Sequence, residues 1–326
     1  MSESNVTSPV GVSQGADLDS DGDAQEIDLT ADPMIADLLT RCMFPAPGSP
    51  LTCAVSGGPD SLALVILARA AGCRVVAVHV DHGLREGSGA EAQVVVAAAS
   101  RFGASVRLER LVLEDGPNLE ERARDARRAV IGDGAATGHT MDDQAETVLG
   151  NLLRGAGLAG LAGMRPGVVH PLLGLRRKET EALCAHLGLA PVRDPSNHDP
   201  RFLRNRIRSE LLPLCNDIAD RDVVPILARQ AAVLAADSDL LENLTADLDP
   251  TDARALASAP PAASRRAVRR WLSEGTGAAH PLPLDAVERV LDVARGDRRA
   301  TEVPGGFRVA RTSGRLRLEG PAPSRG

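Results

Sequence analysis

The chain has 326 residues and a formal net charge of −7, and this length allows a large buried core and two or more domains. No stretch is long and apolar enough to span a membrane, and the N-terminus lacks the basic and apolar regions of a signal peptide. We therefore expect a cytoplasmic protein without membrane contact.

The negative charge is concentrated at the N-terminus. Residues 1–33 contain eight Asp or Glu and no Lys or Arg, and they hold too few apolar side chains to offset the entropy lost on ordering. We predict that they form a disordered acidic tail. Without these eight charges the net charge of −7 becomes +1, so the rest of the chain is close to neutral.

Residues 51–68 predict a strand, a turn and a helix in that order. Leu51 to Val55 form an apolar run typical of a buried parallel strand, and apolar residues continue at helical spacing from Leu62. The glycines of the intervening Ser-Gly-Gly-Pro-Asp-Ser let the backbone turn its N–H groups toward an anion at the helix start. We predict that this turn binds the phosphates of a nucleotide through Ser56, Gly57, Gly58, Pro59, Asp60 and Ser61.

The turn is not a Walker A loop, because that motif needs a lysine and the only lysine of the chain is Lys178. In its place stands Asp60, whose carboxylate would repel phosphate unless a divalent cation such as Mg²⁺ lay between them. Asp60 is therefore a predicted metal ligand. An ordinary helix-start residue is the alternative.

Strands and helices then alternate along the chain. The pattern predicts strands at 74–80, 105–113 and, weakly, 131–137, with helices at 89–102 and 118–130. This alternation favours an α/β fold with a parallel sheet, in which ligands bind beyond the carboxyl ends of the strands. His82, Gly138 and His139 follow such strand ends, and we expect them to line the nucleotide site.

Three acidic residues come together after Gly138-His139. Asp142, Asp143 and Glu146 fall within about one turn of a predicted helix, with Asp142 and Glu146 on one face. Thr140 and Asp143 are spaced as a capping box, which would explain the acids by helix capping alone. The other interpretation makes Asp143 the second carboxylate that holds Mg²⁺ with Asp60.

The turn Ser-Gly-Gly-Pro-Asp-Ser at residues 56–61, together with the residues on either side of it, resembles the signature of the PP-loop ATP pyrophosphatases. Three further segments resemble one branch of that group, the tRNA(Ile)-lysidine synthetases: residues 118–127, residues 154–161 and the stretch from Asp194 to Arg208. Two positions depart from that pattern, namely His170, where the family more often has arginine, and Arg193, where it typically has an acid.

The resemblance implies a parallel-sheet PP-loop (adenine nucleotide alpha hydrolase-like) catalytic domain over residues 34–218. A helical tRNA- or substrate-binding domain would follow over 219–298, and a short C-terminal β piece with a tail over 299–326. Residues 260–326 contain thirteen Arg and seven Asp or Glu. This excess suits contact with an RNA backbone, and a solvated arginine-rich surface is an equally natural interpretation.

The resemblance also implies an activity. The enzyme would use ATP to adenylate the wobble cytidine of tRNA(Ile) with the CAU anticodon, and the amine of free L-lysine would then displace AMP. Asp60, Arg124 and Asp143 would be catalytic, with Asp60 and Asp143 holding Mg²⁺ and Arg124 acting on the α-phosphate or orienting the base. Asp142 or Asp143 would deprotonate lysine. Further substrate contacts would come from Asp142, Glu146, Arg154, Asn197, Arg204, Asn205 and Arg208.

Another PP-loop tRNA-modifying enzyme, such as a cytidine or uridine thiolase, is the alternative function. The five cysteines lie far apart, without the Cys-x-x-Cys pair that sulfur transfer commonly uses. Whether the chain forms a homodimer stays open.

Overall fold

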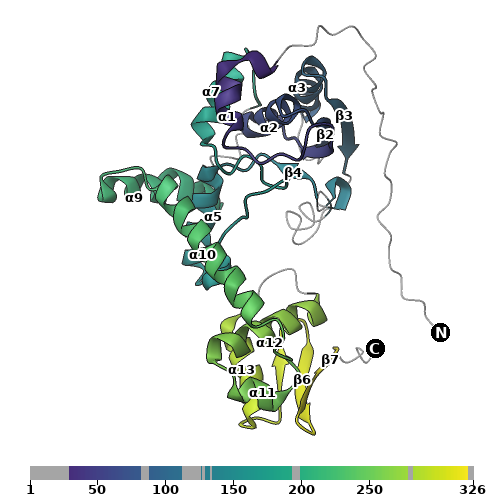
Figure 1. Cartoon of the computed structure of the whole chain (residues 1–326), viewed down its shortest axis with the longest axis vertical. Coiled ribbons are helices and arrows are strands. Elements are labelled where there is room, and N and C mark those ends of the chain that lie inside the picture. The colour runs from purple at the N-terminus through teal and green to yellow at the C-terminus, as the bar shows by residue number, and fades with distance from the viewer. Residues whose placement is uncertain are drawn as a thin grey trace, which may run out of the picture. The chain divides into compact units, whose positions relative to one another are not determined.

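The computed structural model describes residues 29–81, 88–111, 126, 129–132, 134–192, 199–277 and 282–321. The chain divides into two compact units, Met1–Leu234 and Ala235–Gly326, which are drawn in Figure 1. No helix within the described ranges is long and apolar enough to cross a membrane.

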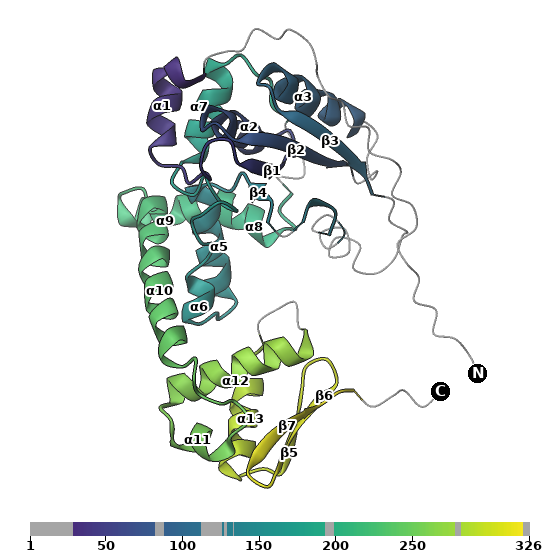
Figure 2. The ribbon, with the colours of Figure 1, turned by 45° about the vertical axis from the view of Figure 1, so that its right-hand side comes forward.

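The first unit is built on a parallel sheet. Its strands β1 (Pro50–Ala54), β2 (Arg74–Asp81), β3 (Ser105–Arg110) and β4 (Ala136–Thr137) are arranged in the order β3-β2-β1-β4 (Figure 2). β1 pairs with β2 from Pro50–Arg74 to Ala54–Val78, and with β4 only at Cys53 and Ala54. From β1 the chain adds β2 and β3 on one side of the sheet and then returns to add β4 on the other side of β1. The ends of β1 and β4 therefore form a topological switch point, which is where α/β sheets bind ligands. The predicted α/β fold is confirmed.

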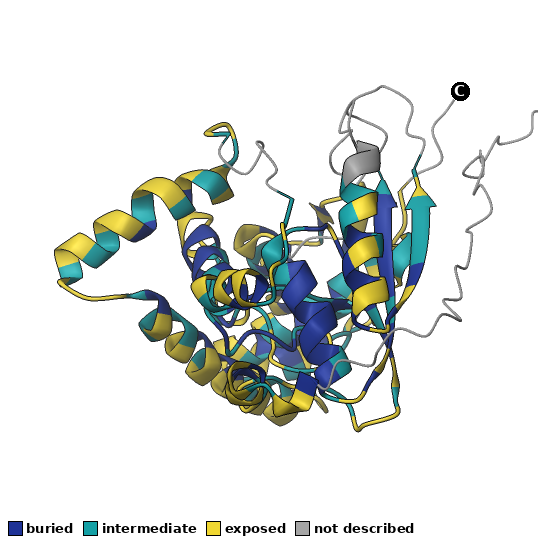
Figure 3. Ribbon diagram, turned by 90° about the horizontal axis from the view of Figure 1, so that it is seen from above, coloured by how far each residue is buried: buried dark blue, intermediate teal, exposed yellow. Residues whose placement is uncertain are grey.

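Helices cover this sheet and bury its strands. α2 (Pro59–Ala70) and α3 (Ser88–Arg101) pack on the strands, and α2 also contacts α1 (Pro33–Leu39) and α7 (Arg177–His186). Neighbours on several sides explain why α2 is apolar over nearly its whole length. Figure 3 shows the buried residues gathered in the sheet and the helices around it.

The chain after β4 forms a smaller helical cluster. α5 (Met141–Leu153) is followed by α6 (Leu158–Leu161), and later by α8 (Leu203–Arg206), a π-helical turn η3 (Ile207–Leu211) and α9 (Leu212–Ala219). A separate apolar cluster that includes Ala145, Leu149, Ile207 and Leu212 packs α5 against the α8–η3 segment. This packing brings Arg204 of α8 and Arg208 of η3 to the first turns of α5.

The second unit combines helices and strands around one core. α10 (Val224–Leu244) crosses the boundary between the units and is followed by α11 (Ala253–Ser258), α12 (Pro261–Thr276) and α13 (Leu284–Arg295). The antiparallel strands β5 (Ala300–Val303), β6 (Phe307–Thr312) and β7 (Arg315–Glu319) complete it. Apolar side chains from helices and strands share this core, among them Val268, Val290, Val303, Val309 and Leu316.

These units differ from the division expected at residues 218 and 298. The boundary lies inside α10 at Leu234, and the C-terminal strands share a core with α11–α13 instead of forming a separate piece. The N-terminal end also differs, because Leu29–Ala31 form a short 3₁₀ helix and Asp32 caps α1. The rest of the expected acidic tail, residues 1–28, lies outside the described residues.

Candidate functional site

The turn after β1 closes tightly onto the start of α2. Gly57 has φ +84°, in the left-handed region, and a Cβ there would lie 2.9 Å from Val192 Cγ2. Ser61 Oγ accepts from the Ser56 amide at 3.2 Å and donates to the Gly58 carbonyl at 2.8 Å. Gly58 is the N-cap of α2 and Pro59 its first residue. A turn of this kind at the start of a 12-residue helix is suited to binding an anion. The positive end of the helix dipole lies there, and the N–H groups of the first helical turn have no partner within the helix.

Gly138, at the end of β4, packs directly against this turn. A Cβ on Gly138 would lie 2.6 Å from the carbonyl oxygen of Asp60 and 2.9 Å from the amide nitrogen of Ser61. Only glycine therefore allows β4 to approach the start of α2 so closely. This contact explains physically why a glycine precedes His139.

Asp143 caps α5 and also takes part in a cluster of charged side chains. Its Oδ2 accepts from the amide of Thr140 at 2.8 Å and from the Thr140 hydroxyl at 2.9 Å, which caps α5. Its Oδ1 points instead to two arginines, lying 2.6 Å from Nη2 of Arg177 and 2.7 Å from Nη2 of Arg204. Capping and participation in a charged site are thus compatible in this residue.

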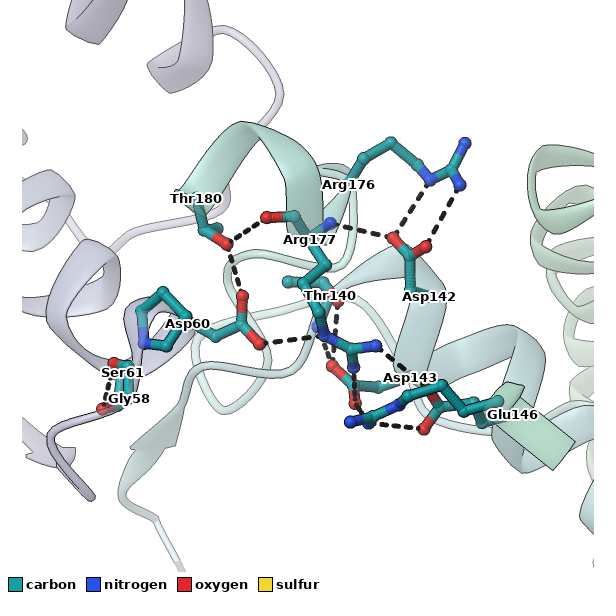
Figure 4. A network of polar contacts seen from close by, with 12 residues as sticks. Gly58, Asp60, Ser61, Thr140, Asp142, Asp143, Glu146, Arg176, Arg177 and Thr180 are labelled. Carbon is teal, nitrogen blue, oxygen red and sulfur yellow. Dashed lines mark hydrogen bonds and ion pairs between the residues drawn. The ribbon is translucent and has the colours of Figure 1, made fainter. Parts of the chain in front are cut away.

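Arg177 connects Asp60, at the start of α2, with Asp143 and Glu146 of α5. Its Nε lies 3.3 Å from Asp60 Oδ2, its Nη2 2.6 Å from Asp143 Oδ1 and its Nη1 3.0 Å from Glu146 Oε1 (Figure 4). The Thr180 hydroxyl, one turn along α7, donates to Asp60 Oδ1. The start of α7 therefore joins the turn after β1 to the start of α5.

Glu146 is the most deeply buried carboxylate of this group. Its side chain is 1% exposed, and besides Arg177 it binds Arg204 Nε at 2.8 Å and Arg208 Nε at 2.7 Å. Three carboxylates, Asp60, Asp143 and Glu146, thus face three guanidinium groups. Such close pairing is what allows charges to remain inside a protein.

The pKa values of these acids follow their surroundings. Burial raises the pKa of Asp60 to about 6, although the Thr180 hydroxyl and Arg177 offset part of this effect. Burial also acts to raise the pKa of Asp143 and of Glu146, but their arginine partners outweigh it and hold both pKa values below the usual range.

Asp142 belongs to a different ion pair. Its carboxylate binds Arg176 Nε at 3.0 Å and Nη2 at 3.1 Å, and it also accepts from the Arg177 amide at 2.8 Å. Arg176 in turn contacts Asp222, which precedes α10. Asp142 therefore pairs with Arg176, and these contacts link α5 to α7 and to Asp222 before α10.

Asp60 and Asp143 fit the ligand set of a magnesium ion. Both carboxylates contact one guanidinium, so their oxygens face a common cation position. Mg²⁺ is commonly bound by one or two carboxylates together with phosphates and water. Across the described ranges no group of three or more His, Cys, Asp or Glu is arranged to hold a metal by itself, so the remaining ligands would have to come from a substrate and from water.

His139 forms part of a polar cluster that the sequence did not predict. The Thr137 hydroxyl lies 2.7 Å from His139 Nδ1 and 2.9 Å from His170 Nδ1. The two imidazole rings meet edge to face at 5.2 Å between centroids. His170, one of the two departures from the family pattern, is therefore a neighbour of the Gly138-His139 motif.

Of the other predicted site residues, some lie at the acidic cluster and others do not. Arg204 and Arg208 join the acidic cluster, whereas the Asn205 side chain donates to the Asp199 carbonyl at 3.0 Å. Arg154 ends α5, about 16 Å along the helix from Asp143, and does not join the cluster. His82, Arg124 and Asn197 lie outside the described residues.

Three residues of this site were not predicted from the sequence: Arg176, Arg177 and Thr180. A signal for the two arginines was present, because they begin a helix whose third residue, Glu179, accepts from the Arg176 amide. Positive side chains are unfavourable at a helix N-terminus unless acids lie nearby. Consecutive arginines at such a place therefore indicate partners elsewhere in the chain.

Comparison with known proteins shows which family the sequence belongs to. The sequence profile of a family described as PP-loop domain matches residues 32–215. A tRNA(Ile)-lysidine synthase of Nocardia farcinica is 41% identical over 302 residues, which cover 86% of this chain and 95% of the relative. The chain belongs to the tRNA(Ile)-lysidine synthase family. A second member, from Salinispora arenicola, is 40% identical over 310 residues, covering 84% of this chain and 92% of the relative.

Family membership confirms the resemblance inferred from the motifs and identifies the protein as an enzyme of the ligase class. Among solved structures, a U34-tRNA thiolase from Methanococcus maripaludis with its [4Fe-4S] cluster aligns with a TM-score of 0.51 and 17% identity, over 62% of this chain and 77% of that one. At this identity the likeness concerns the fold alone.

Proposed function

We propose that the protein joins free L-lysine to C2 of the wobble cytidine of tRNA(Ile) with the CAU anticodon, using ATP and releasing AMP and pyrophosphate. The observation that carries this proposal is the convergence of Asp60, from the nucleotide-binding turn, with Asp143 and Glu146 on one arginine. The identity to tRNA(Ile)-lysidine synthases over nearly their whole length supports the choice of substrates.

The first step would transfer AMP to the cytidine. O2 of the base attacks the α-phosphorus of ATP, and the bond to the β-phosphate oxygen breaks as pyrophosphate leaves. The turn from Ser56 to Ser61 binds the departing pyrophosphate at the start of α2. Asp60 and Asp143 would hold Mg²⁺, which would supply positive charge against the phosphates. Arg124, which lies outside the described residues, stays a predicted contact of the α-phosphate or the base.

The second step would form the carbon–nitrogen bond. The lysine ε-amine attacks C2, and the C2–O2 bond breaks as AMP leaves with the oxygen. An ammonium group cannot attack, so a nearby carboxylate has to accept its proton. Both predicted candidates are held by arginines, Asp142 by Arg176 and Asp143 by Arg177 and Arg204, so Asp142 and Asp143 both stay candidates for this base.

The predicted RNA contacts remain part of this proposal. Arg204 and Arg208 lie at the acidic cluster, and the arginine-rich second unit is the proposed tRNA-binding region. We keep the role of that unit as a prediction from charge and from the family. Whether the chain forms a homodimer likewise stays open.

Incubation of the protein with tRNA(Ile), ATP and labelled lysine tests the proposal. We expect lysine to enter the tRNA with release of AMP and pyrophosphate. Transfer of sulfur instead would favour the thiolase alternative, and the absence of any lysine in the tRNA would refute the proposal. An Asp60→Asn variant should lose ATP–pyrophosphate exchange, and full exchange by that variant would contradict the role given to Asp60.

A further inference from the structure

Arg177 occupies the cation position that Asp60 and Asp143 share. Its three guanidinium nitrogens contact three different carboxylates, with Nε at Asp60, Nη2 at Asp143 and Nη1 at Glu146 (Figure 4). A guanidinium is planar and permanently charged, and its donors leave in fixed directions. One side chain therefore neutralises acids from both α2 and α5.

The backbone around Arg177 holds this side chain in place. Its amide donates to Asp142 Oδ2 at 2.8 Å, and its carbonyl oxygen lies 2.7 Å from the Thr180 hydroxyl oxygen. The side chain is 19% exposed, so solvent screens its ion pairs only in part. Arg177 is thus fixed at both its backbone and its guanidinium.

The neighbouring arginines share two of its three acidic partners but not Asp60. Arg204 and Arg208 bind Asp143 and Glu146 from the α8–η3 segment, and within the described ranges neither of them contacts Asp60. Arg177 is therefore the side chain that bridges the turn after β1 and the start of α5. Removing its charge would leave Asp60 without its arginine partner, while Asp143 would keep Arg204.

A divalent cation would need the same oxygens. Asp60 Oδ2 and Asp143 Oδ1 both face Arg177, so a metal ion can bind them only when the guanidinium moves. A guanidinium taken from a partly buried pair needs another anion, because an unpaired charge in such a place is costly. The phosphates of a nucleotide are suitable acceptors, since arginine binds phosphate through two parallel hydrogen bonds.

We propose that Arg177 is a positioning residue that closes the Asp60–Asp143 pair to divalent cations until nucleotide phosphates are present to accept its guanidinium. The inference rests on the nucleotide site of the proposed function and adds an order to it, because metal enters with ATP and not before it. The site would thereby avoid holding a metal ion in the absence of substrate.

Mn²⁺ is the probe for this inference, because the binding of free Mn²⁺ can be followed by its electron paramagnetic resonance signal without any turnover. The full chain would be titrated at neutral pH without nucleotide, as wild type, Arg177→Gln and Arg176→Gln. Arg176 is the matched control, since it is the adjacent arginine and pairs with Asp142 and Asp222 instead.

We expect the wild type and Arg176→Gln to bind Mn²⁺ weakly, and Arg177→Gln to gain one site that is at least about tenfold tighter. Adding Asp60→Asn to Arg177→Gln should remove the gained site. Equal affinities of Arg177→Gln and wild type would overturn the inference. Tight stoichiometric binding by the nucleotide-free wild type would also overturn it, whether or not the variant folds. Failure of lysine incorporation would refute the proposed reaction without changing these titrations.

Discussion

Replacing Gly138 by alanine should damage the nucleotide site while leaving the fold intact. A Cβ at this position would lie 2.6 Å from the Asp60 carbonyl oxygen, whereas ordinary contacts begin at 3.4 Å, so the two backbones must separate by 3.4 − 2.6 = 0.8 Å. The obstructing atoms are backbone, at the start of α2, and cannot rotate away. Overpacking of this kind costs about 1–3 kcal/mol.

The functional loss should exceed the loss of stability. A displacement near 1 Å of groups that position a reacting phosphate can lower the rate on the order of 100-fold. We therefore expect ATP–pyrophosphate exchange by Gly138→Ala to fall by about that factor, while the free energy of unfolding in urea falls by about 2 kcal/mol.

Gly134→Ala is the matched control for this experiment. Gly134 lies four residues earlier, and a Cβ there would meet no atom within 4 Å. It should retain exchange and lose no stability. Exchange by Gly138→Ala at the level of Gly134→Ala would refute the reasoning, because it would mean that the approach of β4 to α2 does not position the turn.

Three further substitutions test contacts of the site. His79 is 3% exposed, and its Nδ1 donates at 2.8 Å to the carbonyl of Val55, just before the turn. We expect His79→Leu to raise the KM for ATP about tenfold, and His79→Asn to raise it less because asparagine can still donate. Equal KM values for the two variants would count against this contact. Thr180→Val removes the hydroxyl that donates to Asp60 and should lower ATP–pyrophosphate exchange about tenfold, whereas Thr180→Ser should stay near wild type. Similar exchange rates for the two variants would mean that this hydroxyl does not support Asp60. Glu146→Gln leaves three guanidinium groups short of a partner and should lower the free energy of unfolding by about 3 kcal/mol at pH 7. Because the pKa of Glu146 is held below its usual 4.5, its carboxylate contributes fully to the free energy of unfolding above that pH. The difference in this free energy between wild type and Glu146→Gln should shrink as the pH falls through the folded pKa. A difference that does not change with pH would refute this role of the Glu146 charge.

The sequence predicted the elements that carry local signals. The strand, turn and helix around Gly57 and Gly58 were predictable, because apolar periodicity and glycine act over a few neighbouring residues. The weak strand before Gly138 was also recognised, and β4 is only the two residues Ala136–Thr137. The acids at 142, 143 and 146 were identified as one group for the same reason, since helical spacing places them together.

Tertiary structure decided how these acids are partnered. Arg177 is 117 residues from Asp60, and Thr180 is 120 residues from it, so no local pattern could pair them. Arg154 shows the converse, because it adjoins the acidic helix in sequence but ends α5 far from Asp143. The motifs thus determined which chemistry the chain can perform. Packing of α7 against α2 determined which charges face one another, because ion pairs form between neighbours in space and not in sequence.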